Sequence, residues 1–421
     1  DRQNLDKFYI TAPRGEIYDI NGEKIVRTIL EPHLFINLRK ITNQNLLNYK
    51  QIIQYNFSEL DNNEINEIFD SKEILSLVIN LSNVEYEVRN NLLMNYDAFE
   101  IIDLPIRQYI QNELFAHTIG YLGKPNQDDT GEFINALRNN QVGKNGLERQ
   151  YEDFLSGTSG EIIFEGSKII NFKQPIPGND LFLSIDSLTQ SVVRESLQQG
   201  IELANKSFAS SSEIKRGAAV VLDIETGNVV SMVSLPDYDP NKFITGISDF
   251  EYKQLDREQA FNNFAIQGLY PPGSVFKVVA YWLAISENIF PEELNNKDSN
   301  IDCEGSLSFG FDDGSQQVYN DWKLEGHGKV DLGEAIRQSC NVYFWDIALK
   351  IWRNFGNTEA ESVLQDYSRE LGFSNKTNID LPFEKVGIIP DRDLFEEWKI
   401  SRPCLIREEG WLGGDLMNLI I

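Results

Sequence analysis

The sequence predicts an α+β multidomain fold. An extended β-rich pedestal with a small inserted helical lobe is expected first, followed by a domain in which helices flank an antiparallel sheet. Three observations support this prediction. The chain has 421 residues, 41% of them hydrophobic, which is enough for two or three cores. Strand–turn–strand patterns open the chain and recur later, and amphipathic helical patterns lie between and after them. Such runs of strands flanked by helices are typical of α+β proteins.

We expect the pedestal to span residues 1–178. Residues 9–26 have the pattern of two strands joined by an Asn-Gly turn. From about 41 to 102, Leu and Ile recur in a polar background, which predicts the short helices of the inserted lobe. A short helix is predicted at 147–155, and the Pro-Ile-Pro-Gly segment at 175–178 marks the boundary.

The second domain is predicted at 179–421. Its expected elements are a strand at 179–186, a helix at 187–204, a β-hairpin at 217–224 and 229–234, and helices at 276–287 and around 332–352. The hairpin is the strongest of these predictions, because two β-branched runs flank the turn sequence Glu-Thr-Gly-Asn.

Composition excludes nucleic acid as a partner and a disulfide-stapled scaffold as the type of protein. The chain has 65 acidic and 38 basic residues, a formal charge of −27, so it repels phosphate backbones and we expect no nucleic-acid partner. Its 3 cysteines are too few for a disulfide-stapled scaffold. No apolar run reaches the roughly 18 residues of a membrane span. Because Asp1 is not an initiator methionine, the numbering is expected to begin inside a longer protein, with room for a membrane anchor before it.

Ser274 and Lys277 are the first candidate catalytic pair. Two prolines and Gly273 precede Ser274, and an apolar helical pattern follows, so the serine is expected at a helix N-terminus with the lysine one turn along. A desolvated lysine can act as the base that a serine nucleophile needs, and helix N–H groups can stabilise an oxyanion. The spacing alone is equally compatible with a helix-capping serine.

Ser339 and Asn341 are the second pair. They interrupt an apolar, aromatic helical region, where small polar side chains are expected to form specific hydrogen bonds. The alternative is helix packing with a local bond from side chain to backbone.

Together these pairs resemble the Ser-x-x-Lys and Ser-x-Asn motifs of penicillin-interacting serine transpeptidases. The resemblance is closest to class B penicillin-binding proteins of the elongation type, the penicillin-binding protein 2 group, and it covers most of the chain. Further matching segments are Ala12-Pro-Arg-Gly15 with Asp19, Gly143 to Tyr151, Ser184-Ile-Asp186, Asp239-Pro240-Asn241 and Gly326-His327-Gly328. One departure is Ile20, where the family usually has arginine.

The resemblance implies a peptidoglycan D,D-transpeptidase that needs no cofactor for catalysis. Ser274 would attack the D-Ala-D-Ala amide of a stem peptide, and Lys277 would accept its proton. Ser339 would relay a proton to the leaving amine, while Asn341 would hold the substrate amide and orient Lys277. The amine of a second stem peptide would then complete the cross-link. β-Lactams would trap Ser274 as a slowly hydrolysed acyl-enzyme.

It also implies partners and a location. We expect a SEDS-family glycan polymerase and other elongation-complex proteins as partners, at the periplasmic side of the inner membrane. The family's third motif, Lys-Thr-Gly or Lys-Ser-Gly, is expected after residue 421, and Lys376-Thr377-Asn378 does not replace it. On this ground the catalytic domain is expected to be incomplete at its C-terminus, and this chain alone to be a poor or inactive transpeptidase.

Four residues between and within these motifs suggest a structural zinc site. Cys303, Asp321, His327 and Cys340 offer two thiols, a carboxylate and an imidazole, which suit a closed tetrahedral site. The alternatives are a disulfide between Cys303 and Cys340 or two free buried thiols.

Two other functions remain open. A non-catalytic envelope scaffold would use the pedestal to bind a glycan-polymerising membrane partner. A serine β-lactamase is disfavoured, because it would have no pedestal and no deacylating glutamate is evident.

Overall fold

The computed structural model describes residues 5–133, 141–166, 168–207, 213–291, 297–310 and 316–421. The chain forms two compact units. The first comprises Asp1–Gly268 and Asp380–Phe383, and the second comprises Leu269–Ile379 and Glu384–Ile421. This division describes compactness, and the domain boundary predicted after residue 178 stays a prediction.

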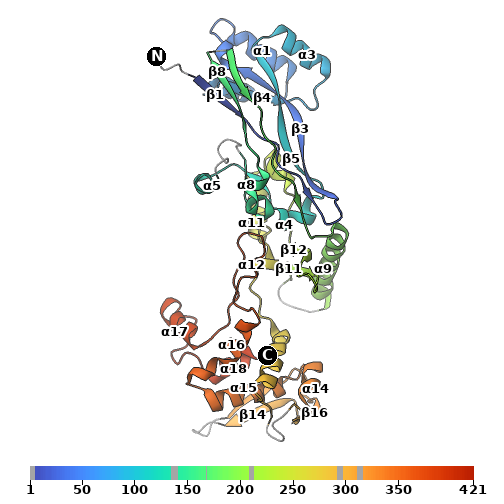
Figure 1. The fold of residues 1–421 in the computed structure, drawn as a ribbon, viewed down its shortest axis with the longest axis vertical. Helices are drawn as coiled ribbons and strands as arrows, with labels where there is room; N and C mark the ends of the chain where they lie inside the picture. The colour runs from blue at the N-terminus through green and yellow to red at the C-terminus, as the bar shows by residue number, and fades with distance from the viewer. Residues whose placement is uncertain (1–4, 134–140, 167, 208–212, 292–296, 311–315) are drawn as a thin grey trace. The chain divides into compact units, whose positions relative to one another are not determined.

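A sheet around one long strand organises the first unit (Figure 1). The strand β3 (Lys24–Asn37) pairs antiparallel with β2 (Ile17–Tyr18), β4 (Leu75–Asn80) and β5 (Phe99–Tyr109). β10 (Leu181–Phe182) adds a parallel pairing to β2. The sheet therefore joins the N-terminal segment to residues beyond 180.

The segment predicted as one N-terminal hairpin contributes to two sheets. The Asn-Gly turn is confirmed, with Gly22 at φ 80° and its N–H donating to the carbonyl of Asp19 at 3.1 Å. Residues 5–10, however, form β1 (Leu5–Ile10), which pairs antiparallel with β8 (Gly160–Glu165) in a separate three-stranded sheet. A proline cannot donate to a ladder, so the strand ends before Pro13.

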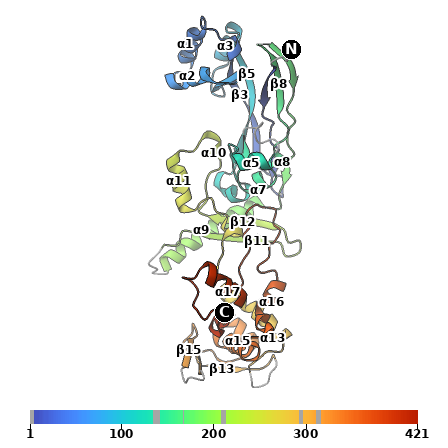
Figure 2. The ribbon, with the colours of Figure 1, turned by 90° about the vertical axis from the view of Figure 1, so that its left-hand side faces the viewer.

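The helical lobe is confirmed. Helices α1 (Leu46–Asn56), α2 (Asn62–Asp70) and α3 (Tyr86–Asn95) lie at one end of the long strands (Figures 1 and 2). Their apolar faces pack on β3 and β5 in a core of their own. Its fully buried members include Leu34, Ile36, Ile53, Phe57 and Leu81.

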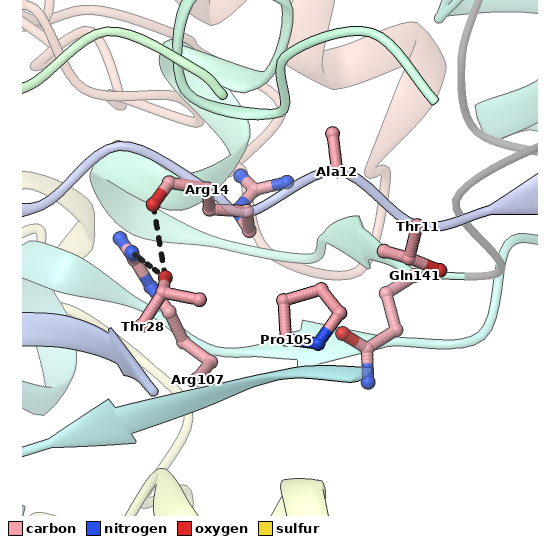
Figure 3. Close-up of a pocket in the computed structure, with 7 residues that line it drawn as sticks. All are labelled: Thr11, Ala12, Arg14, Thr28, Pro105, Arg107 and Gln141. Atoms are coloured by element: carbon pink, nitrogen blue, oxygen red, sulfur yellow. Dashed lines mark hydrogen bonds between the residues drawn. The ribbon is translucent and has the colours of Figure 1, made fainter. Parts of the chain in front are cut away.

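A buried ionic cluster connects four segments of the first unit, and Figure 3 shows its two arginines, Arg14 and Arg107, with Thr28 between them. Arg14 contacts Glu148 and Glu152 at 2.8 and 2.9 Å, and Arg107 contacts Glu148 at 2.7 Å. Thr28 bridges the two arginines, donating to the Arg14 carbonyl at 2.9 Å and accepting from Arg107 at 3.2 Å. Two arginines and two glutamates balance one another, which is the condition for burying charge at low cost.

The predicted helix and hairpin after residue 187 are confirmed. Helix α9 spans Ser187–Ser207, and β11 (Gly217–Leu222) pairs antiparallel with β12 (Val229–Leu235). The strand expected at 179–186 is shorter than predicted. The observed strand is β10 (Leu181–Phe182). Asp186, the last residue of the predicted strand, instead accepts the Thr189 N–H at 2.7 Å and caps α9.

The second unit is mainly helical. Its core combines α13 (Lys277–Ser286), α14 (Leu332–Arg337), α15 (Asn341–Phe355), α16 (Val363–Glu370) and α18 (Gly413–Leu419). The helix predicted around 332–352 is therefore two helices. The break lies just before Asn341, where Ser339 adopts a left-handed conformation.

The remaining elements are short. They are β6 (Leu122–Gly123), β7 (Val142–Gly143), β8 (Gly160–Glu165), β9 (Lys168–Lys173), β13 (Ile301–Cys303), β14 (Ser306–Gly310), β15 (Gln316–Asn320), β16 (Gly328–Val330), α4 (Ala116–Ile119), α5 (Gln127–Glu132), α7 (Gly146–Gln150), α8 (Glu152–Leu155), α10 (Asn241–Thr245), α11 (Asp249–Glu258), α12 (Phe264–Gln267) and α17 (Arg392–Ser401). Among the described residues, no helix combines the length and apolar character that crossing a membrane requires.

Candidate active site

Ser274 lies in a single 3₁₀ turn, Gly273–Phe276, that leads directly into α13. The two prolines before it end the preceding segment, and Gly273 takes φ 58°, a conformation that glycine adopts without strain. Lys277 is the first residue of α13. Its Nζ lies 3.2 Å from the Ser274 Oγ, which places an amine within hydrogen-bond reach of the hydroxyl.

Lys277 is enclosed by oxygen atoms from the second motif. Its side chain is 1% exposed, and Nζ donates to the Ser339 carbonyl at 3.0 Å and to the Ser339 Oγ at 3.1 Å. Asn341 Oδ1 is nearest, at 2.5 Å. The two predicted pairs therefore meet, and the small polar side chains in the apolar helical region have the specific partners that the sequence suggested.

The break between α14 and α15 brings Ser339 and Asn341 to Lys277. Ser339 has φ 54°, so the chain turns sharply after α14. Asp321, from the loop after β15, then accepts the N–H groups of Asn341 at 2.8 Å and Val342 at 3.3 Å. A buried carboxylate thus satisfies the first free donors of α15 and fixes its starting point.

Burial sets the proton affinity of Lys277. Desolvation lowers the pKa of this lysine to about 8, and the nearby Asp321 carboxylate opposes part of that shift. Cys340, like Asp321, raises the pKa of Lys277. About a tenth of Lys277 is then neutral at pH 7, which gives the site a usable base next to Ser274.

The sequence interpretation missed Trp322. Its indole Nε1 donates to the Ser339 carbonyl at 3.1 Å, although its side chain is 66% exposed. Its position directly after Asp321, between the two motifs, was the only signal in the sequence. The ring of Phe344 also borders Lys277, with its centroid 5.7 Å from Nζ.

The four predicted metal ligands come together behind the second motif. The ligand atoms of Cys303, Asp321, His327 and Cys340 all lie within 4.8 Å of one another. The sulfurs of the two cysteines are 3.4 Å apart, as two thiols, and His327 Nε2 is 3.1 Å from Asp321 Oδ1. Burial raises the pKa of the Cys340 thiol to about 12, so without a cation it is protonated.

This cluster fits a tetrahedral zinc ion. Two sulfurs bound to one zinc lie roughly 3.7 Å apart, given Zn–S bonds of about 2.3 Å. The free ring nitrogen of His327, Nδ1, faces Gln338 Oε1 at 3.3 Å, which orients the imidazole as ligand histidines usually are. Four protein ligands leave no open position, so such a site is structural.

Lys376-Thr377-Asn378 lies away from this arrangement. Its threonine donates from both N–H and hydroxyl to Glu384 within an exposed loop. The segment forms no strand beside Ser274, as the sequence interpretation held.

Two family models match the chain. The penicillin-binding protein dimerisation domain matches residues 9–183, and the penicillin-binding protein transpeptidase domain matches residues 217–404. Curated relatives are peptidoglycan D,D-transpeptidases MrdA. The Acinetobacter baumannii protein is 29% identical over 100% of this chain and 59% of its own length. The Haemophilus influenzae protein is 32% identical over 77% of this chain and 46% of its own length.

Solved structures give the same result. Penicillin-binding protein 2 of Helicobacter pylori, in a complex with MreC, aligns with a TM-score of 0.76 and 28% identity, covering 100% of this chain and 73% of that one. Penicillin-binding protein 2 of Pseudomonas aeruginosa, in a complex with WCK 5153, aligns with a TM-score of 0.61 and 26% identity, covering 99% of this chain and 66% of that one.

These likenesses confirm the α+β class and the resemblance inferred from the motifs. The chain spans between 46% and 62% of the length of the curated MrdA relatives from A. baumannii, H. influenzae and Escherichia coli. The chain belongs to the penicillin-binding proteins of the penicillin-binding protein 2 type, with a dimerisation domain followed by a transpeptidase domain.

Proposed function

We propose that this chain carries the nucleophile of a peptidoglycan D,D-transpeptidase. One observation carries the proposal: the Lys277 amine lies 3.2 Å from the Ser274 hydroxyl and is held there by Ser339 and Asn341. A serine next to a desolvated lysine is suited to acyl transfer.

The geometry supports a two-step reaction. Lys277 takes the Ser274 proton as Oγ attacks the carbonyl carbon between the two terminal D-alanines. The C–N bond breaks, the proton passes from Lys277 through Ser339 to the leaving amine, and D-alanine departs, leaving an acyl-serine ester and a neutral Lys277. The amine of a second stem peptide then attacks this ester and gives its proton to Lys277. The ester bond to Ser274 Oγ breaks, Oγ takes the proton back from Lys277, and the cross-link is complete. Throughout, Asn341 orients Lys277 and binds the substrate amide.

β-Lactams fit the same first step. Ser274 opens the strained amide of the ring. Because the amine stays covalently attached to the acyl group, it does not leave the site, and the acceptor amine of the second step cannot take its place. We propose that β-lactams inhibit the protein as slowly hydrolysed acyl-enzymes.

The release of D-alanine tests the proposed reaction. The protein, expressed in the full length that its gene encodes, is incubated with a D-Ala-D-Ala stem peptide and an acceptor amine. We expect release with the wild type and with Ser286→Ala, a change at an exposed serine at the end of the helix α13 that follows Ser274, and none with Ser274→Ala. Equal release by Ser274→Ala and the wild type would contradict the proposal.

We also propose partners and a location. The structure of Helicobacter pylori penicillin-binding protein 2 is a complex with MreC, which supports an elongation-complex protein as a partner of this chain. A SEDS-family glycan polymerase is proposed as a second partner, because cross-linking needs newly polymerised glycan. Peptidoglycan lies outside the cytoplasmic membrane, so the proposed site of action is its periplasmic face. Co-purification from detergent extracts, with and without the dimerisation domain, tests these partners.

The scaffold alternative makes an opposite prediction about cells. A passive scaffold needs the pedestal but not the nucleophile, so Ser274→Ala would restore growth and cell shape to a strain that lacks the protein. We expect it to fail, while Ser286→Ala succeeds at equal protein levels.

We further propose a structural zinc ion held by Cys303, Asp321, His327 and Cys340. The support is the convergence of four suitable ligand atoms within 4.8 Å. Such an ion would hold Cys340 and Asp321 in place behind Ser339 and Asn341, and it takes no part in the reaction steps above.

A further inference from the structure

Trp322 is a largely exposed residue that makes a specific hydrogen bond. Its side chain is 66% exposed, yet its single polar atom is committed to a specific bond, with Nε1 donating to the Ser339 carbonyl at 3.1 Å. The residue before it, Asp321, is buried and caps α15. The hydrogen bonds of Asp321 therefore hold the backbone next to Trp322 in place near Lys277, while the ring of Trp322 is exposed to solvent.

The Ser339 carbonyl is the meeting point of two donors. It accepts from Lys277 Nζ at 3.0 Å and from Trp322 Nε1 at 3.1 Å, which uses both lone pairs of the oxygen. Ser339 itself is left-handed, with φ 54°, a conformation that costs about 1 kcal/mol or more outside glycine. A bond from outside the turn helps to keep the carbonyl in this position.

We propose that Trp322 is a positioning residue of the transpeptidase site: its indole N–H holds the Ser339 carbonyl and thereby sets the place of the Lys277 amine opposite Ser274. This inference rests on the proposed function. Trp322 does not touch the reacting atoms, and it acts through Ser339.

The same bond limits how well the site stabilises a charged Lys277. A carbonyl that already accepts from the indole is a weaker acceptor for the ammonium group. The titratable groups facing Lys277 are Asp321 and Cys340, and its uncharged partners are Ser274, Ser339 and Asn341. Without the indole N–H, the carbonyl is free for the ammonium, so the acid limb of the acylation profile moves to higher pH.

The substitution Trp322→Phe tests this, because phenylalanine keeps an aromatic ring beside His327 and removes the N–H donor. Trp398→Phe, in α17, is the matched control. Using the full-length protein and a fluorescent penicillin, we expect Trp322→Phe to lower the acylation rate constant about tenfold at saturation, with penicillin affinity unchanged. Its acid limb should shift upward, and Trp398→Phe should match the wild type.

Two outcomes would overturn the proposal. One is an unchanged rate and pH profile in Trp322→Phe. The other is a lower rate with an unmoved profile and a reduced melting temperature, which indicates a purely structural role.

A separate measurement covers the case in which the wild type is not acylated, which would count against the proposed function. Hydrogen exchange of the Trp322 indole N–H is then followed by NMR. We expect exchange at least about tenfold slower than in a solvated indole, despite the exposed ring. Exchange at the solvated rate would refute the hydrogen bond and the proposal with it.

Discussion

The Asp321 carboxylate accepts the backbone N–H of Asn341 at 2.8 Å, and through this bond a loop residue determines where the Asn341 side chain meets Lys277. The bond crosses 20 residues of sequence and starts α15 immediately after the left-handed Ser339. The second motif is thus positioned by a carboxylate that lies outside it.

Asp321→Ala should therefore weaken both folding and acylation. Removing a buried carboxylate leaves two backbone donors unpaired, and we expect a loss of about 1–3 kcal/mol in the free energy of unfolding. Acylation by a fluorescent penicillin should fall with it, because Asn341 is released. Urea unfolding and acylation rates measure the two effects.

Asp331→Ala is the control for this prediction. Asp331 caps α14 by accepting the Glu334 N–H at 2.8 Å, but it is exposed and does not hold Asn341. It should cost about 1 kcal/mol and leave acylation intact. If Asp321→Ala behaved in the same way, the positioning role of Asp321 would be wrong.

Acylation should depend on the protonation of Lys277. Burial lowers its pKa to about 8, and only the neutral amine can accept the Ser274 proton. The rate therefore rises with pH and levels off above about 8, whereas a lysine with the ordinary pKa near 10.4 would give a rise at much higher pH. The measurement is the acylation rate constant from pH 5 to 10. A rate that is already constant below pH 7 would rule out this assignment.

Zinc should copurify with the protein at about one equivalent when no chelator is used. His327→Ala and Cys303→Ser should lose the metal and lower the melting temperature, because metal binding to the native state stabilises it. Cys404→Ser, at an exposed cysteine, is the matched control and should change neither. Metal analysis that finds less than about a tenth of an equivalent in the wild type would exclude the zinc site.

Glu148→Gln should strongly destabilise the first unit. Glu148 is fully buried between Arg14 and Arg107, and those arginines hold its pKa below the usual range although burial alone would raise it. Losing one carboxylate leaves buried positive charge uncompensated, which costs about 3–5 kcal/mol. Thermal unfolding is the readout. The control is Glu334→Gln, which removes a carboxylate from the solvent-accessible ion pair with Arg337. A change below about 1 kcal/mol would show that the charges are not effectively buried.

Local patterns in the sequence were sufficient to predict much of the fold and of the candidate site. Helix α9 and the β11–β12 hairpin follow from residues close together in the chain, and so does the placement of Ser274 and Lys277 one helical turn apart. The sequence also predicted that the four candidate metal ligands lie together, because scarce ligand types gather between the two motifs.

What the sequence did not predict depends on long-range contacts. β1 finds its partner β8 about 150 residues away, so no local pattern separates it from the hairpin that follows. The ion pair between Arg14 and Glu148 spans 134 residues. The bond from Trp322 to Ser339 depends on the left-handed turn, which a helical pattern across 332–352 conceals.

The most direct test of the central claim is to locate the acyl group. The full-length protein is incubated with a penicillin, digested and mapped by mass spectrometry. We predict a penicilloyl adduct on Ser274, absent from Ser274→Ala and retained in Ser286→Ala. Failure of the wild type to form an adduct, or an adduct on another residue that persists in Ser274→Ala, would contradict the account.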